Sequence, residues 1–222
     1  MPMLEFFTPT FIIAVLVSLS VHEWAHGFVA YKLGDPTAKY EGRLTLNPIS
    51  HLDPIGTLLF LVVGFGWGKP VPVNPQYFKN HNKDTALVAI AGPLSNFIMA
   101  ITAFSILMVV GKGSFLFYGG GANASVLTTM LSTLSQDFIR INLILMAFNL
   151  LPIAPLDGSK VIRAFIPYKY EREYLEFMAR GPQILLILVL ASMFLNIPIF
   201  SVWIGLIISP ILNIFALMAG IG

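Results

Sequence analysis

Residues 11–33 read FIIAVLVSLSVHEWAHGFVAYKL, an apolar run in which His22, Glu23 and His26 stand within five positions. A helix of about 20 apolar residues is long enough to cross a bilayer. A charged side chain at the centre of such a helix costs about 2.5–3.5 kcal/mol even on a lenient scale, so ionisable groups there are typically functional. At about 100° per residue, the three side chains lie on one face of a helix.

The composition extends the membrane assignment to the whole chain. Of 222 residues, 56% are hydrophobic and 11% are charged, and the mean hydropathy is +0.80. A soluble domain carries about 25% charged residues. The chain has no cysteine, which excludes disulfides and leaves His, Asp and Glu as metal ligands. The net charge is +2 and no basic patch is interleaved with aromatic residues, so we expect no nucleic-acid partner.

The apolar segments predict a single domain over residues 1–222, an all-α polytopic membrane protein with about five full transmembrane helices. Each expected span approaches the length that crosses the hydrocarbon layer. The spans are residues 8–33, 85–110, 126–151, 182–195 (extended by residues 174–178) and 198–218.

Two regions between the first two long spans differ from the rest. Residues 54–68 are apolar but cover only about 20 Å of helix, less than the roughly 30 Å hydrocarbon layer, so we expect a short re-entrant segment. Residues 37–54 and 68–84 contain turn residues and alternate prolines. They predict small membrane-associated β-strands or extended edge segments.

The basic residues fall into two groups, which predicts the orientation of the chain in a cell membrane. One group lies between the first two long spans and the other follows the third, whereas Lys112 stands apart from both. The groups are Lys32, Lys39, Arg43, Lys69, Lys79 and Lys83, and Lys160, Arg163, Lys169, Arg172 and Arg180. If residues 54–68 do not cross, the positive-inside rule places the N-terminus outside and the C-terminus and active-site side in the cytoplasm.

His22, Glu23 and His26 form the pattern H-E-x-x-H. On a helix, this pattern presents two imidazoles to Zn²⁺ and a glutamate that can act on water beside the metal. The alternative is three polar residues that line the interior of a bundle, but the cost of polarity at bilayer depth favours the metal. Catalytic zinc also needs a third protein ligand and an open position.

The candidates for the third ligand are Asp157, His51 and Asp53. Asp157 follows NLLPIAP, whose prolines remove backbone donors and let a side chain turn into the bundle. Its alternative role is to cap the helix that follows. His51 and Asp53 occur in NPISHLDP and are typical of loop-ordering groups or of groups behind the ligands. His51 as a ligand stays open.

The motifs HEWAH, AGPLSN and FNLLPIAPLDG, in this order, resemble the site-2 protease family of intramembrane zinc metalloproteases. NPISHLDPIG and KPVPVNP resemble its compact form, which lacks PDZ and CBS domains. The resemblance covers residues 15–165. It implies one Zn²⁺ per chain, held by His22, His26 and Asp157, with Glu23 as general base.

The resemblance also implies a substrate: a single-span membrane protein that is cut within the bilayer, as in regulated intramembrane proteolysis. Asn96 and Asn149 fall at family positions linked to substrate or oxyanion contacts. Hydrogen bonding between helices is an alternative role for both amides, and AGPLSN also suits small-residue packing. We expect a catalytic core over residues 8–166 and a helix pair over residues 174–220 without chemistry.

Two other functions use the same residues. Intramembrane His, Glu and Asp can form an ion path in a transporter, but the sequence has no inverted repeat. An inactive scaffold would keep the metal for folding alone, and such a site has no need of Glu23.

Overall fold

Helix α1 (Pro9–Lys32) carries the two histidines, and local chemistry sets both of its ends. The computed structural model describes residues 8–63, 66–111 and 126–220. The Thr8 hydroxyl accepts a hydrogen bond from the Phe11 N–H at 3.2 Å and so caps the helix. After Lys32 the chain leaves the helix through Gly34, whose φ of +108° suits glycine.

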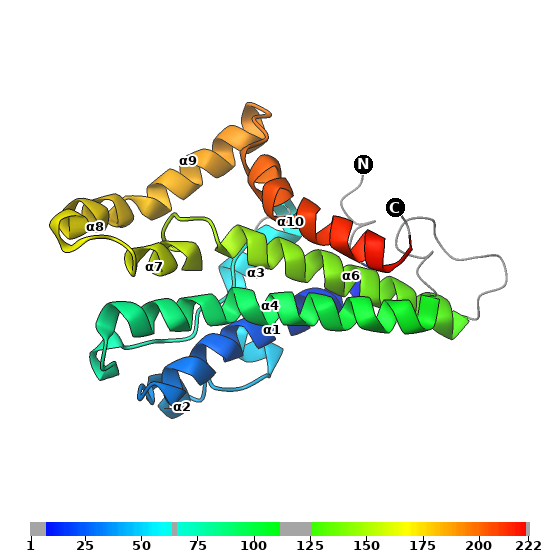
Figure 1. The fold of residues 1–222 in the computed structure, drawn as a ribbon, viewed down its shortest axis with the longest axis horizontal. Coiled ribbons are helices and arrows are strands. Elements are labelled where there is room, and N and C mark those ends of the chain that lie inside the picture. Colours follow the sequence, from blue (N-terminus) through cyan, green and yellow to red (C-terminus); the bar gives the residue numbers. More distant parts are fainter. Residues whose placement is uncertain (1–7, 64–65, 112–125, 221–222) are drawn as a thin grey trace.

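Helices α4 (His81–Gly111) and α6 (Val126–Asn149) lie alongside α1, and α10 (Ile199–Met218) covers α6 (Figure 1). The buried core joins α4, α6 and α10. Phe104 of α4 stacks on Phe215 of α10 with ring centroids 4.2 Å apart. The indole N–H of Trp203 in α10 donates to the Ala147 carbonyl of α6 at 2.8 Å. These contacts fix the helices against which α1 packs.

The chain after α6 turns back toward α1 before it leaves the bundle. Helix α7 (Asp157–Arg163) places Asp157 at its first position. Helices α8 (Glu171–Ala179) and α9 (Gly181–Phe194) then extend away from the bundle, and α9 returns to α10 (Figure 1). Only Gly181 of α9 is buried.

The number of helices that can span a membrane differs from the expected five. By length and composition, α1, α4 and α10 qualify, and α8 with α9, bent by 51°, make a fourth if the pair forms one span. Helix α6 has 24 residues, but its first half is rich in Thr and Ser and also contains Gln and Asp. The described helices therefore support three or four spans.

The short apolar segment begins and ends at one place. It forms α3 (Pro54–Val63), whose 10 residues rise about 15 Å. Leu52 and Gly68, which flank it, form an antiparallel bridge. A Cβ on Gly56 would collide with the Trp67 carbonyl, so the returning chain passes directly against the start of α3. The two ends of this segment therefore lie next to each other, as expected for a re-entrant segment.

The predicted small β-strands are not found in the described ranges, where the only pairing outside helices is the Leu52–Gly68 bridge. Instead, α2 (Thr37–Tyr40) and the 3₁₀ turns Pro48–His51 and Pro75–Tyr77 occupy these regions. The physical reason is that side chains, rather than another strand, form hydrogen bonds with backbone N–H and C=O groups of the proline segment, residues 69–74. The Asn74 N–H, for example, donates to the Asp35 carboxylate at 2.7 Å.

Candidate metal centre

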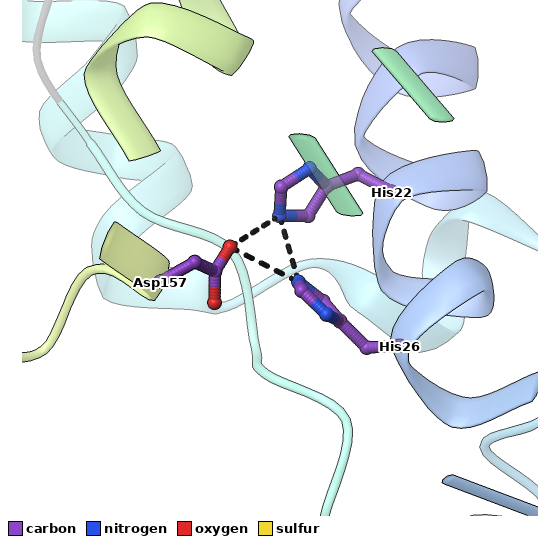
Figure 2. Close-up of side chains that lie close together, drawn as sticks. All are labelled: His22, His26 and Asp157. Carbon is purple, nitrogen blue, oxygen red and sulfur yellow. Dashed lines mark hydrogen bonds and ion pairs between the residues drawn. The ribbon is translucent and has the colours of Figure 1, made fainter. Parts of the chain in front are cut away.

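His22 and His26 stand one turn apart on α1, and the carboxylate of Asp157 meets them from the start of α7 (Figure 2). The two Nε2 atoms are 3.0 Å apart. Asp157 Oδ2 lies 3.2 Å from His22 Nε2 and 3.1 Å from His26 Nε2. All three side chains are buried. The structure thus brings the carboxylate of Asp157 to two histidines, although Asp157 and His26 stand 131 positions apart in the sequence.

The hydrogen bonds of the two imidazoles assign their tautomers. His26 Nδ1 lies 2.7 Å from the Val88 carbonyl, which only accepts, so this nitrogen must carry the proton. His22 Nδ1 lies 2.6 Å from Asn96 Oδ1 and donates in the same way. A ring that carries its single proton on Nδ1 points the lone pair of Nε2 at Asp157. This arrangement, with Nδ1 held by a carbonyl or amide oxygen, is usual for metal-binding histidines.

The three facing atoms fit a divalent metal ion. Two imidazole nitrogens and a carboxylate oxygen converge, and a cation at their centre satisfies all three when each ring carries its proton on Nδ1. Ligands about 2.0–2.1 Å from a tetrahedral zinc lie about 3.3 Å from one another, close to the observed 3.0–3.2 Å. Two imidazoles and one carboxylate also form a ligand set typical of catalytic zinc.

Gly92 of α4 lets that helix pass directly against the histidine rings. A Cβ at this position would collide with His26 Nε2 and come within 2.6 Å of His22 Cε1. From the sequence, the AGPLSN motif suggests a small-residue packing patch or a source of substrate contacts. Its glycine agrees with the packing alternative, and the particular neighbours, the two histidine rings, could not be identified without the helix packing.

Glu23 follows His22 on α1 and adds no atom to the three-residue cluster. Its Oε2 accepts a hydrogen bond of 2.8 Å from the Val71 N–H in the proline segment. Arg43 holds this segment by donating from Nη2 to the carbonyls of Lys69 and Pro70, at 2.8 and 3.2 Å. The orientation of Glu23 is therefore linked to a loop 48 residues away.

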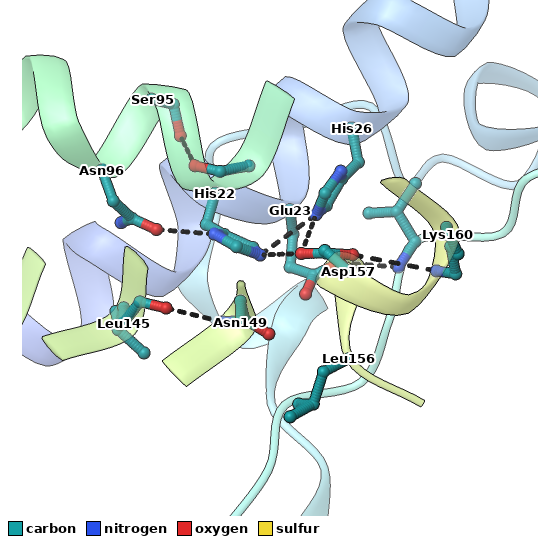
Figure 3. Close-up of polar contacts among 12 residues, drawn as sticks. His22, Glu23, His26, Ser95, Asn96, Leu145, Asn149, Leu156, Asp157 and Lys160 are labelled. Atoms are coloured by element: carbon teal, nitrogen blue, oxygen red, sulfur yellow. Dashed lines mark hydrogen bonds and ion pairs between the residues drawn. The ribbon is translucent and has the colours of Figure 1, made fainter. Parts of the chain in front are cut away.

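Asn96 and Asn149, the two predicted amides, occupy different surroundings. Asn96 is fully buried behind His22 and bonds to Asn142 as well. Asn149 is half-buried near the end of α6, and its Nδ2 donates to the Leu145 carbonyl of its own helix (Figure 3). Asn142 was missed from the sequence, although an amide in an apolar helix segment is the same kind of signal as His22.

His51 and Asp53 lie apart from the three-residue cluster and order the loop before α3. His51 Nε2 lies 2.8 Å from the Thr45 carbonyl, and the His51 carbonyl accepts from the Lys69 N–H at 2.8 Å. Asp53 Oδ1 accepts from the Gly56 N–H at 2.8 Å, at the start of α3. Within residues 8–63, 66–111 and 126–220, His22, His26 and Asp157 alone form a cluster with metal-ligand spacing.

A helical membrane protein with a buried His-His-Asp cluster and an adjacent glutamate belongs to the class of membrane metallopeptidases. Residues 10–191 match the family model of Peptidase family M50, and the chain belongs to this family, that of the site-2 proteases. It is accordingly a zinc metalloprotease whose cofactor is Zn²⁺.

Several curated relatives carry matching names. The chain is 48% identical over 159 residues to YwhC of Bacillus subtilis, named as a zinc metalloprotease, covering 72% of this chain and 70% of that protein. It is 31% identical over 158 residues to the zinc metalloprotease MJ0392 of Methanocaldococcus jannaschii, and the match covers 71% of this chain and 34% of that protein. It is 30% identical over 114 residues to the regulator of sigma E protease of Haemophilus influenzae, and the match covers 46% of this chain and 26% of that protein. No solved structure matches the chain significantly.

Proposed function

We propose that this chain is an intramembrane protease that hydrolyses peptide bonds within the transmembrane segments of membrane-anchored substrates. One observation carries the proposal. Three metal-ligand atoms from α1 and α7 converge at 3.0–3.2 Å inside a bundle of apolar helices, directly beside Glu23. A purely structural metal site has no need of an adjacent base.

His22, His26 and Asp157 hold the zinc in this proposal. Zinc in such a site lowers the pKa of water to about 7 and polarises a carbonyl group. Glu23 takes the proton of the attacking water and passes it to the leaving amine. The new carbon–oxygen bond replaces the carbon–nitrogen bond of the substrate, and the amine nitrogen ends with the proton. The Val71 N–H keeps the Glu23 carboxylate in one orientation for this transfer.

The two predicted amides take separate roles in this proposal. Asn149 lies near the cluster at the end of α6 and is half-buried, so its side chain can turn from the Leu145 carbonyl to a developing oxyanion. Asn96 has both polar atoms engaged by buried partners, which suits the positioning of His22 rather than contact with substrate. His51 and Asp53 support the loop that precedes α3.

The substrate is a single-span membrane protein, and cleavage serves regulated intramembrane proteolysis. A cluster enclosed by membrane-type helices supports cleavage at bilayer depth. The similarity to a protein named regulator of sigma E protease supports a regulatory role.

The proposed location is the cell membrane, with the N-terminus outside and the C-terminus and active-site side in the cytoplasm. The Leu52–Gly68 bridge supports this orientation. A segment that returns to its starting side keeps both groups of basic residues on one face.

The test is to measure bound zinc and cleavage of a model transmembrane substrate for the parent protein and for Glu23→Gln. Glutamine still accepts from the Val71 N–H but takes no proton, so we expect parental zinc content and no cleavage. Glu173→Gln, at an exposed position of α8, is the matched control and should keep both. Parental cleavage by Glu23→Gln, or a parent without zinc, would contradict the proposal.

A further inference from the structure

A line of buried polar side chains connects α6 to the metal centre through α4. Asn142, Asn96 and Ser18 are each fully buried, and they belong to α6, α4 and α1. We propose that Asn142 is a positioning residue that acts through Asn96 to decide which nitrogen of His22 carries the proton. This inference rests on the proposed function, in which His22 Nε2 is a zinc ligand.

Asn142, at the end of the line farthest from the metal centre, sets which atoms donate and which accept along the line. The Asn142 side-chain nitrogen lies 2.8 Å from the Phe138 carbonyl of its own helix and 2.8 Å from Ser18 Oγ. A backbone carbonyl accepts hydrogen bonds and never donates them, so the amide atom that faces it must be the NH₂ group. The Asn142 oxygen is therefore turned toward α4.

Asn96 carries the same donor-to-acceptor order from Asn142 to His22. Asn142 Oδ1 can only accept, and Asn96 Nδ2 donates to it at 2.8 Å, with a longer contact of 3.4 Å to the Ser18 carbonyl. The Asn96 oxygen then faces His22 Nδ1 at 2.6 Å and accepts its proton. The other ring nitrogen, Nε2, is left with a lone pair for the metal.

His22 needs this support more than His26 does. The His26 ring is set by the Val88 carbonyl, which belongs to helix α4 and cannot reverse its polarity. The His22 ring is set by a side-chain amide, and a half-turn of that amide would exchange its donor and acceptor. A reversed Asn96 would donate to Nδ1 and force the proton onto Nε2. Asn142 opposes the reversal, because two amide oxygens would then face each other.

Three variants test the relay through zinc affinity, measured in detergent by competition with a chelator. Asn142→Leu keeps the approximate size of the side chain but removes the acceptor for Asn96. We expect zinc binding about 10–100-fold weaker, the usual effect of losing a group behind a ligand. Asn142→Asp, which burial keeps protonated, retains an acceptor toward Asn96 and an O–H donor toward the Phe138 carbonyl. We expect zinc affinity within about threefold of the parent.

Ser132→Ala is the matched control on the same helix. Ser132 is also fully buried, and its hydroxyl has no hydrogen-bond partner among the described residues. We expect parental zinc affinity from this variant. The visible absorption spectrum of the Co²⁺-substituted protein gives a second readout, and we expect it to change in Asn142→Leu but not in Ser132→Ala.

The outcomes separate the relay from the proposed function. A folded Asn142→Leu variant with parental zinc affinity would overturn the relay alone, provided that the parent binds zinc and cleaves substrate. Equal losses in the leucine and aspartate variants would also overturn it, because packing would then explain both. If the leucine variant does not fold, Asn142→Ala removes the same acceptor without adding bulk. A parent without zinc would overturn the proposed function itself.

Discussion

Gly92 of α4 lies against the ring of His26 so closely that a Cβ atom would collide with Nε2. Gly92→Ala should therefore displace the rings and α4 from each other. We expect a large loss of bound zinc and a destabilisation of about 1–3 kcal/mol, as for other overpacked sites. Metal analysis and thermal unfolding measure the two effects. Gly205→Ala in α10 is the control, since a Cβ there meets no atom within 4 Å. It should leave bound zinc unchanged and leave stability equal or higher by up to about 1 kcal/mol.

Asp157 and Asp53 offer a direct comparison between two carboxylates that the sequence presented as candidate ligands. Asp157→Asn keeps the size of the side chain but loses the charge that faces two imidazole lone pairs. We expect zinc affinity to fall by more than about a hundredfold, beyond the roughly 10–100-fold effect of groups behind the ligands.

Asp53→Asn should keep zinc at the parental level. The amide oxygen that this substitution introduces would still accept from the Gly56 N–H, which is the contact that Asp53 makes. His51→Gln extends the comparison to the remaining candidate, and we expect parental zinc affinity there as well. A loss of zinc in either variant, with Asp157→Asn unaffected, would reverse the ligand assignment.

Arg43 should affect catalysis without affecting zinc. It holds the carbonyls of Lys69 and Pro70, and the next residue, Val71, donates to Glu23. Arg43→Gln removes these two hydrogen bonds, so we expect the cleavage rate to fall about tenfold. This fall corresponds to a rise of about 1.4 kcal/mol in the activation free energy. Zinc content should be unchanged.

Arg172→Gln is the control for the removal of an arginine. Arg172 is exposed and pairs with Glu176 at 3.5 Å in α8, and such surface pairs contribute little. Cleavage should stay at the parental rate. Zinc loss in Arg43→Gln, or full activity in that variant, would show that the proline segment does not orient Glu23.

The membrane orientation can be measured by labelling single cysteines, because the parent has none. Lys83→Cys and Lys169→Cys should both react with an impermeant reagent from the cytoplasmic side only. The pairing of Leu52 with Gly68 brings the two ends of residues 54–68 together, so we expect the chain to be back on the cytoplasmic side at Lys83. Lys112→Cys, outside the described residues, should react from the opposite side. External labelling at Lys83 with cytoplasmic labelling at Lys169 would require residues 54–68 to cross the membrane, and external labelling at both would reverse the orientation of the whole chain.

The arrangement of His22, Glu23 and His26 was predictable from the sequence because it depends only on helix periodicity. Asp157 was a candidate because prolines interrupt the helix before it. The partner of Asn96 was not predictable, because Asn142 lies 46 positions away and meets it only through the packing of α4 on α6.

Two other features of the fold also depended on distant contacts. No strand forms over residues 68–84, one of the two alternatives expected there, because Glu23 and Asp35 accept from backbone donors that a ladder would need. The apolar second half of α6 suggested a full span, but its first half is polar. Ser132 and Ser135 in that half are buried, and neither residue signals burial from the sequence alone.

The central claim is zinc-dependent cleavage within a transmembrane segment, and the most direct measurement maps the cut. The parent protein and a single-span model substrate are reconstituted together in liposomes, and the products are identified by mass spectrometry. We predict new termini inside the hydrophobic stretch, lost after metal chelation and restored by added zinc. Cuts only outside that stretch, or cleavage that persists without metal, would contradict the account.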